Sequence, residues 1–116
     1  MTAPRGAGGR AEAAAAEFLA GQGLVLVGSN YRCRTGEIDL VLRDGPTIVF
    51  VEVRLRTNPS FGGAAESIGP RKRARIIAAA RHYLAGKAEP PCRFDVVLLD
   101  RLEPPRIEWI RDAFSA

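Results

Sequence analysis

Two acidic residues on neighbouring expected strands are the first candidates for chemistry. The segments 36–43 and 47–54 have the apolar patterns of strands, and Asp44-Gly45 between them is a strong hairpin signal. If Asp44-Gly45 is a two-residue loop, Asp39 and Glu52 are diagonal neighbours on one face, with Cβ atoms roughly 7 Å apart or less. Carboxylates at that separation can converge on one divalent cation between them.

Glu52 is unusual for its position, because it interrupts the apolar run Ile-Val-Phe-Val-x-Val of the expected central strand. A buried carboxylate is costly unless it is paired with a cation or binds a metal. Two interpretations therefore stay open. Either Glu52 forms a local ion pair with Arg54 while Asp39 is solvated near the end of its strand, or the two acids form a metal site.

Basic residues are concentrated in the segment 54–81. This segment has seven Lys and Arg residues against the single acid Glu66, a net charge of +6, whereas the whole chain carries +4. The asymmetry favours binding to a phosphate backbone, and the free N–H groups at the start of a helix also attract anions. The alternative is an ordinary solvated helix face. Lys72 lies near the margin of the apolar stripe, from where it could point along the sheet.

The elements that must position these residues follow the order αβββαβ(β). Glu12 shares the inward helical face with Ala15, Ala16 and Leu19. We expect a disordered tail over 1–9 and a single α/β domain over 10–116. The expected helices are Arg10–Ala20 and Pro70–Ala85, and the expected strands are Leu24–Val27, Gly36–Arg43, Thr47–Arg54, Arg93–Leu99 and, at an edge, Arg106–Ile110.

The composition is that of an ordinary globular protein. Of 116 residues, 47% are hydrophobic and 26% charged, which excludes disordered and fibrous classes and suits one domain. Cys33 and Cys92 lie far apart, as expected of free thiols in a reducing compartment. No stretch resembles a signal peptide or approaches the ~20 apolar residues of a membrane span. We expect a soluble cytoplasmic protein with no membrane partner.

The run Gly36-Glu-Ile-Asp-Leu40, followed by Phe50-Val-Glu-Val-Arg54, resembles the YraN-like family of bacterial proteins. That family is similar to the PD-(D/E)xK nuclease superfamily, whose members resemble restriction endonucleases and Holliday-junction resolvases. The resemblance covers most of residues 9–100 and includes Asn30-Tyr31-Arg32 and Lys72. It implies a restriction-endonuclease-like αβββαβ core, with a mixed central sheet flanked by helices and acids that hold Mg²⁺ or Mn²⁺ beside a scissile phosphate.

The resemblance also implies roles for single residues. Asp39 and Glu52 match the metal-binding acids, and Glu12 matches the first-helix glutamate of resolvase-like branches, which binds the ion or orients water. Arg54 stands where the superfamily has the lysine of its ExK element. Arginine keeps a positive charge near the reacting phosphate, but it stays protonated and cannot act as a base.

The leading hypothesis is a nucleic-acid-binding protein that hydrolyses phosphodiester bonds as a metal-dependent endonuclease. DNA or RNA, including branched forms, would be held along its backbone by Arg56, Arg71, Lys72 and Arg73. The first alternative is a binding module whose catalytic site has decayed, which Arg54 motivates. The second is a protein-interaction module that pairs through the open edge 106–110. A homodimer would present two sites to the two strands of a duplex.

Overall fold

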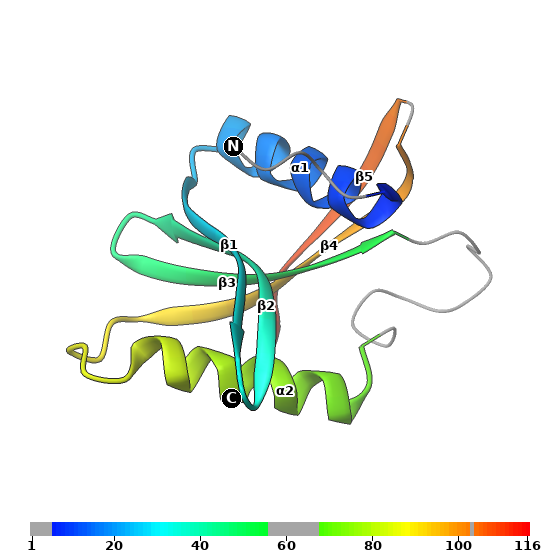
Figure 1. The fold of residues 1–116 in the computed structure, drawn as a ribbon. Helices are drawn as coiled ribbons and strands as arrows, with labels where there is room; N and C mark the ends of the chain where they lie inside the picture. Colours follow the sequence, from blue (N-terminus) through cyan, green and yellow to red (C-terminus); the bar gives the residue numbers. More distant parts are fainter. Residues whose placement is uncertain (1–5, 56–67, 103) are drawn as a thin grey trace.

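The computed structural model describes residues 6–55, 68–102 and 104–116. Their order is one helix, three strands, a second helix and two strands (Figure 1). The expected α/β fold class is therefore confirmed. The elements are α1 (Gly6–Gly21), β1 (Val25–Cys33), β2 (Gly36–Asp44), β3 (Thr47–Leu55), α2 (Pro70–Leu84), β4 (Cys92–Leu102) and β5 (Pro105–Phe114).

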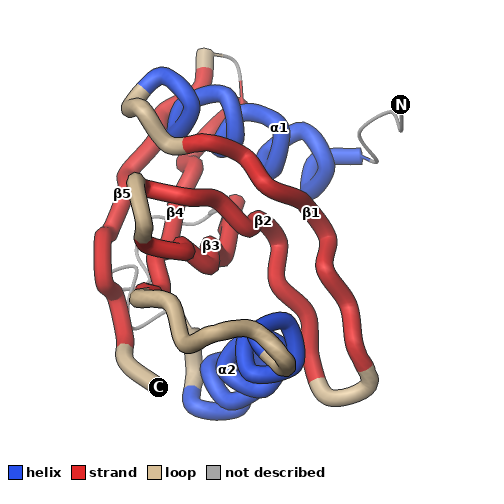
Figure 2. The backbone as a smooth tube through the Cα atoms, turned by 90° about the vertical axis from the view of Figure 1, so that its left-hand side faces the viewer, coloured by secondary structure: helices blue, strands red, loops and turns tan. Residues whose placement is uncertain are grey.

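The five strands form one mixed sheet in the order β1-β2-β3-β4-β5. Neighbours are antiparallel except β3 and β4, which are parallel and are joined by a connection that contains α2. The two helices lie on opposite sides of the sheet (Figure 2). A mixed sheet flanked in this way is consistent with the restriction-endonuclease-like fold that the resemblance implies.

Each helix closes a separate hydrophobic core. Alternation along β3 sends Val49 and Val51 to the α1 side and Phe50 to the α2 side. Glu52 continues the alternation on the side of Phe50, so it belongs to the face that α2 covers. The α1 side is filled by Ala11, Ala15, Leu19, Leu40, Leu42, Val97 and Leu99, and the α2 side by Val41, Ile76, Ala79, Ala80, Val96 and Leu98.

The hairpin between β2 and β3 has a different register from the expected one. Asp44 pairs with Thr47, so Gly45 and Pro46 form the two-residue loop, and Arg43 pairs with Ile48 instead of Pro46. Gly45 has φ 59°, and a glycine with positive φ followed by a residue with negative φ is typical of a type II′ turn. The correction shifts the register by two positions, which keeps the side chains of the paired stretch 40–44 on their predicted faces.

Some element ends also differ from prediction. The helix α1 begins at Gly6 instead of Arg10, so residues 6–9 are helical and not part of the expected tail, while 1–5 lie outside the described residues. The strand β1 runs on to Cys33 through a bulge between Leu26 and Gly28. Within the described ranges, neither helix has the length and apolarity needed to cross a bilayer.

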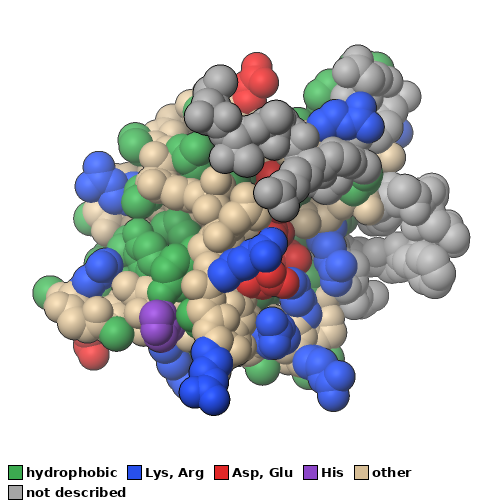
Figure 3. Space-filling model, in the orientation of Figure 1, with side chains coloured by type: hydrophobic (Ala, Val, Ile, Leu, Met, Phe, Trp, Pro, Cys, Tyr) green, Lys and Arg blue, Asp and Glu red, His purple; other side chains and the backbone are tan. Residues whose placement is uncertain are grey.

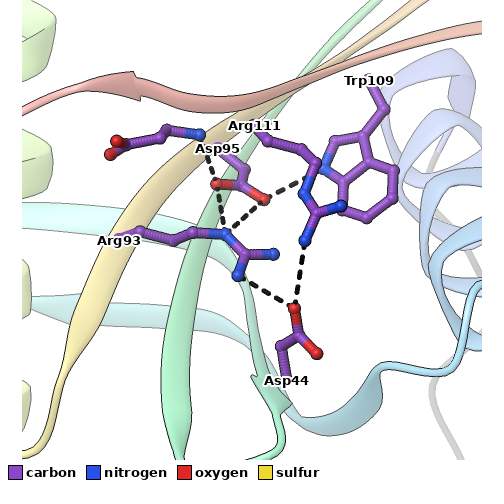
Figure 4. A network of polar contacts seen from close by, with 6 residues as sticks. Asp44, Arg93, Asp95, Trp109 and Arg111 are labelled. Carbon is purple, nitrogen blue, oxygen red and sulfur yellow. Dashed lines mark hydrogen bonds and ion pairs between the residues drawn. The ribbon is translucent and has the colours of Figure 1, made fainter.

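A buried polar network fixes the far strands of the sheet (Figure 4). Asp95 on β4 is fully buried and accepts hydrogen bonds from Arg93 Nε at 3.1 Å, Trp109 Nε1 at 3.0 Å and the backbone N–H of Asp112 at 2.9 Å. Arg93 Nη1 donates to Asp44 Oδ2 at 2.9 Å. The network therefore ties β4 and β5 to the end of β2, on the strand that also carries Asp39.

Candidate functional site

The candidate site forms where β2 separates from β3. Pairing between the two strands begins at Leu40 and Val51, and beyond that pair Asp39 Oδ2 accepts the backbone N–H of Val53 at 2.8 Å. The Asp39 carboxylate thus replaces the backbone acceptor that β2 no longer provides. Ile38 packs on the α2 side although Leu40 packs on the α1 side, so β2 changes face at Asp39. In Figure 1, the paired strands β1 and β2 cross α2 together.

The second acid, Glu52, is buried on the face of the sheet toward α2. Its side chain is only 5% exposed, and its Oε1 lies 3.6 Å from Lys72 Nζ. The same ammonium group lies 3.5 Å from Glu37 Oε1. Within the described parts of the chain, Glu52 Oε2 is buried without a hydrogen-bond partner. The corrected register also brings Asp39 from a diagonal position to the one opposite Glu52.

The two acids oppose each other electrostatically. Burial raises the pKa of Glu52 to about 8, repulsion from Asp39 adds to the effect, and the positive charges of Lys72 and Arg54 offset part of it. Burial also raises the pKa of Asp39, against the hydrogen bond from Val53. Asp39 is therefore not the solvated strand-end acid of the simpler interpretation. Both acids ionise at a cost that a bound cation would remove.

The predicted third acid, Glu12, reaches the same site from α1. Burial, followed by repulsion from Asp39, raises the pKa of its carboxyl group, while a hydrogen bond from the Asn30 side chain lowers it. Glu12 is half-buried at this position. The sequence did not identify Asn30 as a residue of the site. Its backbone φ of 53° is rare outside glycine.

The four predicted phosphate-binding residues do not act as one group. Arg71 is exposed in the first turn of α2, as expected. Lys72 instead lies among the acids, and Arg73 turns back, with its Nε donating to the carbonyl of Ile68 at 2.8 Å. Arg56 lies outside the described residues.

A second basic element comes from the hairpin that joins β1 and β2. Arg32 is 75% exposed, with its Nε 3.8 Å from Glu37 Oε2, and Arg34 is exposed at the turn. The hairpin packs closely against α2. A Cβ added at Gly36 would lie only 1.9 Å from the Arg75 carbonyl oxygen. On the face in Figure 3, several Lys and Arg side chains lie next to and below a central group of acids.

The donor set fits a hard divalent cation. Mg²⁺ prefers carboxylate oxygens, and it commonly takes only one or two of them from a protein and keeps several waters. Asp39 and Glu52 supply two carboxylates, one with an unpartnered buried oxygen. Across the described ranges there is no cluster of three or more His, Cys, Asp or Glu side chains placed to hold a metal.

Comparison with known proteins assigns the chain to a family. The model described as "Uncharacterised protein family UPF0102" matches residues 11–99. The UPF0102 protein of Methylobacillus flagellatus is 55% identical over 109 residues, 94% of this chain and 96% of its own. That of Nitrosospira multiformis is 59% identical over 109 residues, 93% and 92% of the two chains, and one from Nitrosomonas europaea is 53% identical over 116 residues, 99% and 98%. The YraN-like resemblance is thus confirmed, and this chain belongs to the UPF0102 family.

Proposed function

We propose that this protein binds DNA or RNA and cleaves its phosphodiester bonds as a divalent-metal-dependent endonuclease. The observation that supports this proposal most is the pair Asp39 and Glu52 at the divergence of β2 and β3, with a buried, unpartnered carboxylate oxygen. Structural ion pairs bury acids too, but they satisfy the acid's oxygens. An acid pair that lacks enough partners is better suited to a cation.

The residues of the site divide the work by their chemistry. Asp39 and Glu52 hold Mg²⁺ or Mn²⁺, which when bound lowers the pKa of a coordinated water and neutralises charge on the phosphate. Lys72 fixes Glu52 through their ion pair. Arg54 stays protonated and stabilises negative charge that develops on the phosphate. Glu12 accepts a hydrogen bond from water and orients it.

The surrounding cations suit a nucleic-acid backbone. Arg32 and Arg34 on the hairpin and Arg71 and Arg75 on α2 are exposed, and Arg32 lies 3.8 Å from the Glu37 carboxylate. Such contacts position a phosphate chain but carry little sequence information. We therefore expect binding that weakens steeply with salt and cleavage with little base preference.

The test is cleavage of single-stranded, duplex and branched DNA and RNA with Mg²⁺ or Mn²⁺. The wild type should cleave at least one substrate only with metal, and Glu52→Gln should abolish cleavage while the protein stays folded. Glu17→Gln is the matched control, because Glu17 is an exposed acid on the same helix as Glu12. Metal-dependent cleavage that survives Glu52→Gln would contradict the site.

A second candidate is a nucleic-acid-binding module whose catalytic site has decayed. One observation favours it: the ExK lysine position holds Arg54, which cannot take up a proton. This candidate expects salt-dependent binding without metal-stimulated cleavage, and cleavage that appears on Arg54→Lys. Turnover by the wild type would exclude it.

A further inference from the structure

Asn30 has a backbone conformation that nothing in the strand pattern demands of a non-glycine residue. It lies inside β1 with φ 53°, whereas strand residues have strongly negative φ. Among residues with side chains, asparagine tolerates this left-handed region better than most. In this conformation the Asn30 side chain does not follow the alternation of the strand. The position of its amide group therefore needs a separate explanation.

The register places Asn30 beside the candidate site. Its neighbours Ser29 and Tyr31 pair with Leu40 and Ile38 of β2, so Asn30 faces Asp39 across the strand pair. Asn30 and Asp39 are therefore the two positions at which the β1–β2 ribbon bends away from the rest of the sheet. Asn30 is an exposed residue that lies beside Asp39 on the neighbouring strand.

The Asn30 amide is used there in one specific way. It donates a hydrogen bond to the carboxylate of Glu12 on α1, and the same carboxylate feels the negative charges of Asp39 and Glu37. Repulsion from these two acids would push a flexible glutamate on a helix surface toward solvent. A fixed amide donor opposes that movement, because a hydrogen bond to an ionised acceptor is stronger than one between neutral groups.

We propose that Asn30 is a positioning residue, whose left-handed backbone aims its amide so that Glu12 is held beside Asp39. The inference rests on the proposed function for its consequence: a fixed Glu12 orients water next to the metal pair. Outer contacts of this kind commonly change metal affinity by 10–100-fold when they are removed. The simpler alternative is that asparagine only satisfies the backbone bend and that its amide has no further effect.

Asn30→Gly separates the two explanations. Glycine adopts positive φ without steric cost, so the bend is kept and only the amide is lost. Glu12→Ala removes the acceptor in an alanine-rich helix that favours alanine. The experiment measures Mn²⁺ affinity by calorimetry, and urea unfolding without metal, for the wild type, both single variants and the double variant. Asn30→Asp is a further variant that keeps the backbone preference but replaces the donor by a negative charge.

The proposal expects Asn30→Gly to weaken Mn²⁺ binding about tenfold when Glu12 is present and less than about twofold in the Glu12→Ala background. Asn30→Asp should weaken binding at least as much. Unchanged affinity in Asn30→Gly, or equal losses in both backgrounds, overturns it. If the wild type binds no Mn²⁺, the proposed function fails, and the metal-free unfolding data decide the inference: non-additive effects of the two substitutions support it and additive effects overturn it.

Discussion

Replacing Glu52 by glutamine should make the metal-free protein more stable at neutral and alkaline pH. Glu52 has a pKa of about 8 in the folded chain, against an ordinary value of 4.5. The folded state therefore holds the proton more tightly than the unfolded state, and the free energy of unfolding falls as pH rises between these values. Glutamine has nearly the same shape but never ionises, so the fall disappears in Glu52→Gln.

The size of the effect follows from proton linkage. One proton bound in the folded state but not in the unfolded state changes the unfolding free energy by about 1.4 kcal/mol per pH unit. Between pH 4.5 and about 8, the cost of ionising Glu52 reaches about 5 kcal/mol as an upper limit. The pKa of Asp39 is also raised, so its ionisation likewise lowers the free energy of unfolding as the pH rises. Glu52→Gln removes the neighbouring negative charge and therefore also reduces the cost of ionising Asp39.

The assay is urea unfolding followed by circular dichroism from pH 5 to 9, with a chelator present. The wild type should lose stability as the pH rises, whereas Glu52→Gln should be nearly independent of pH and the more stable protein at pH 8. Glu17→Gln, which changes an exposed acid on α1, should follow the wild type. Equal pH dependence of the wild type and Glu52→Gln would refute the reasoning. Added Mn²⁺ should restore stability at pH 8 to the wild type and to Glu17→Gln but not to Glu52→Gln.

Three further substitutions test the surroundings of the site. Gly36→Ala should destabilise the protein by about 1–3 kcal/mol in the same unfolding assay, because the new Cβ would lie 1.9 Å from the Arg75 carbonyl oxygen and the backbone must shift to admit it. Asp95→Asn should lower the unfolding free energy by about 3 kcal/mol, because it removes the fully buried charge that balances Arg93 and leaves that guanidinium with Asp44 alone. Lys72→Gln removes a cation that lowers the pKa of Glu52, so the loss of stability should continue to higher pH than in the wild type.

The strands that carry the site could be predicted from sequence because their patterns are strong. A run of β-branched residues interrupted by one acid identifies β3, and alternation fixes which side chains share a face. The register was predicted two positions away, because Asp44-Gly45 is a common hairpin sequence while Gly45-Pro46 is the loop that forms. A shift of two positions keeps paired side chains on the same face, so the sequence could predict that Asp39 approaches Glu52. It could not predict their exact pairing, nor that β2 changes face at Asp39.

Irregular backbone limits the prediction most at β1. The residues at 28–30, Gly-Ser-Asn, are typical of turns, so the sequence predicts that the strand ends before them. The structure instead continues the strand through a bulge and through Asn30, which has a left-handed backbone. The bend carries the ribbon over α2 and brings Asn30 to Glu12. Contacts between residues distant in sequence, such as this one, leave no local pattern to read.

Side-chain direction on α2 was also beyond the sequence. Charge alone grouped Arg71, Lys72 and Arg73 as phosphate ligands, yet consecutive helical residues point about 100° apart. Lys72 turns to the acids, while Arg73 turns to the carbonyl of Ile68. Lys72 lies near the margin of the apolar stripe, from where it could point along the sheet, but the sequence did not indicate that it meets Glu37 and Glu52.

The most direct test of the whole account is a calorimetric titration of Mn²⁺ into the wild type and Asp39→Asn at pH 8.5, where Glu52 is ionised. We predict that the wild type binds one ion and that Asp39→Asn binds it at least about tenfold more weakly, with Glu17→Gln equal to the wild type. Equal affinity in the wild type and Asp39→Asn, or no binding by the wild type, would contradict the claim that these acids share a cation.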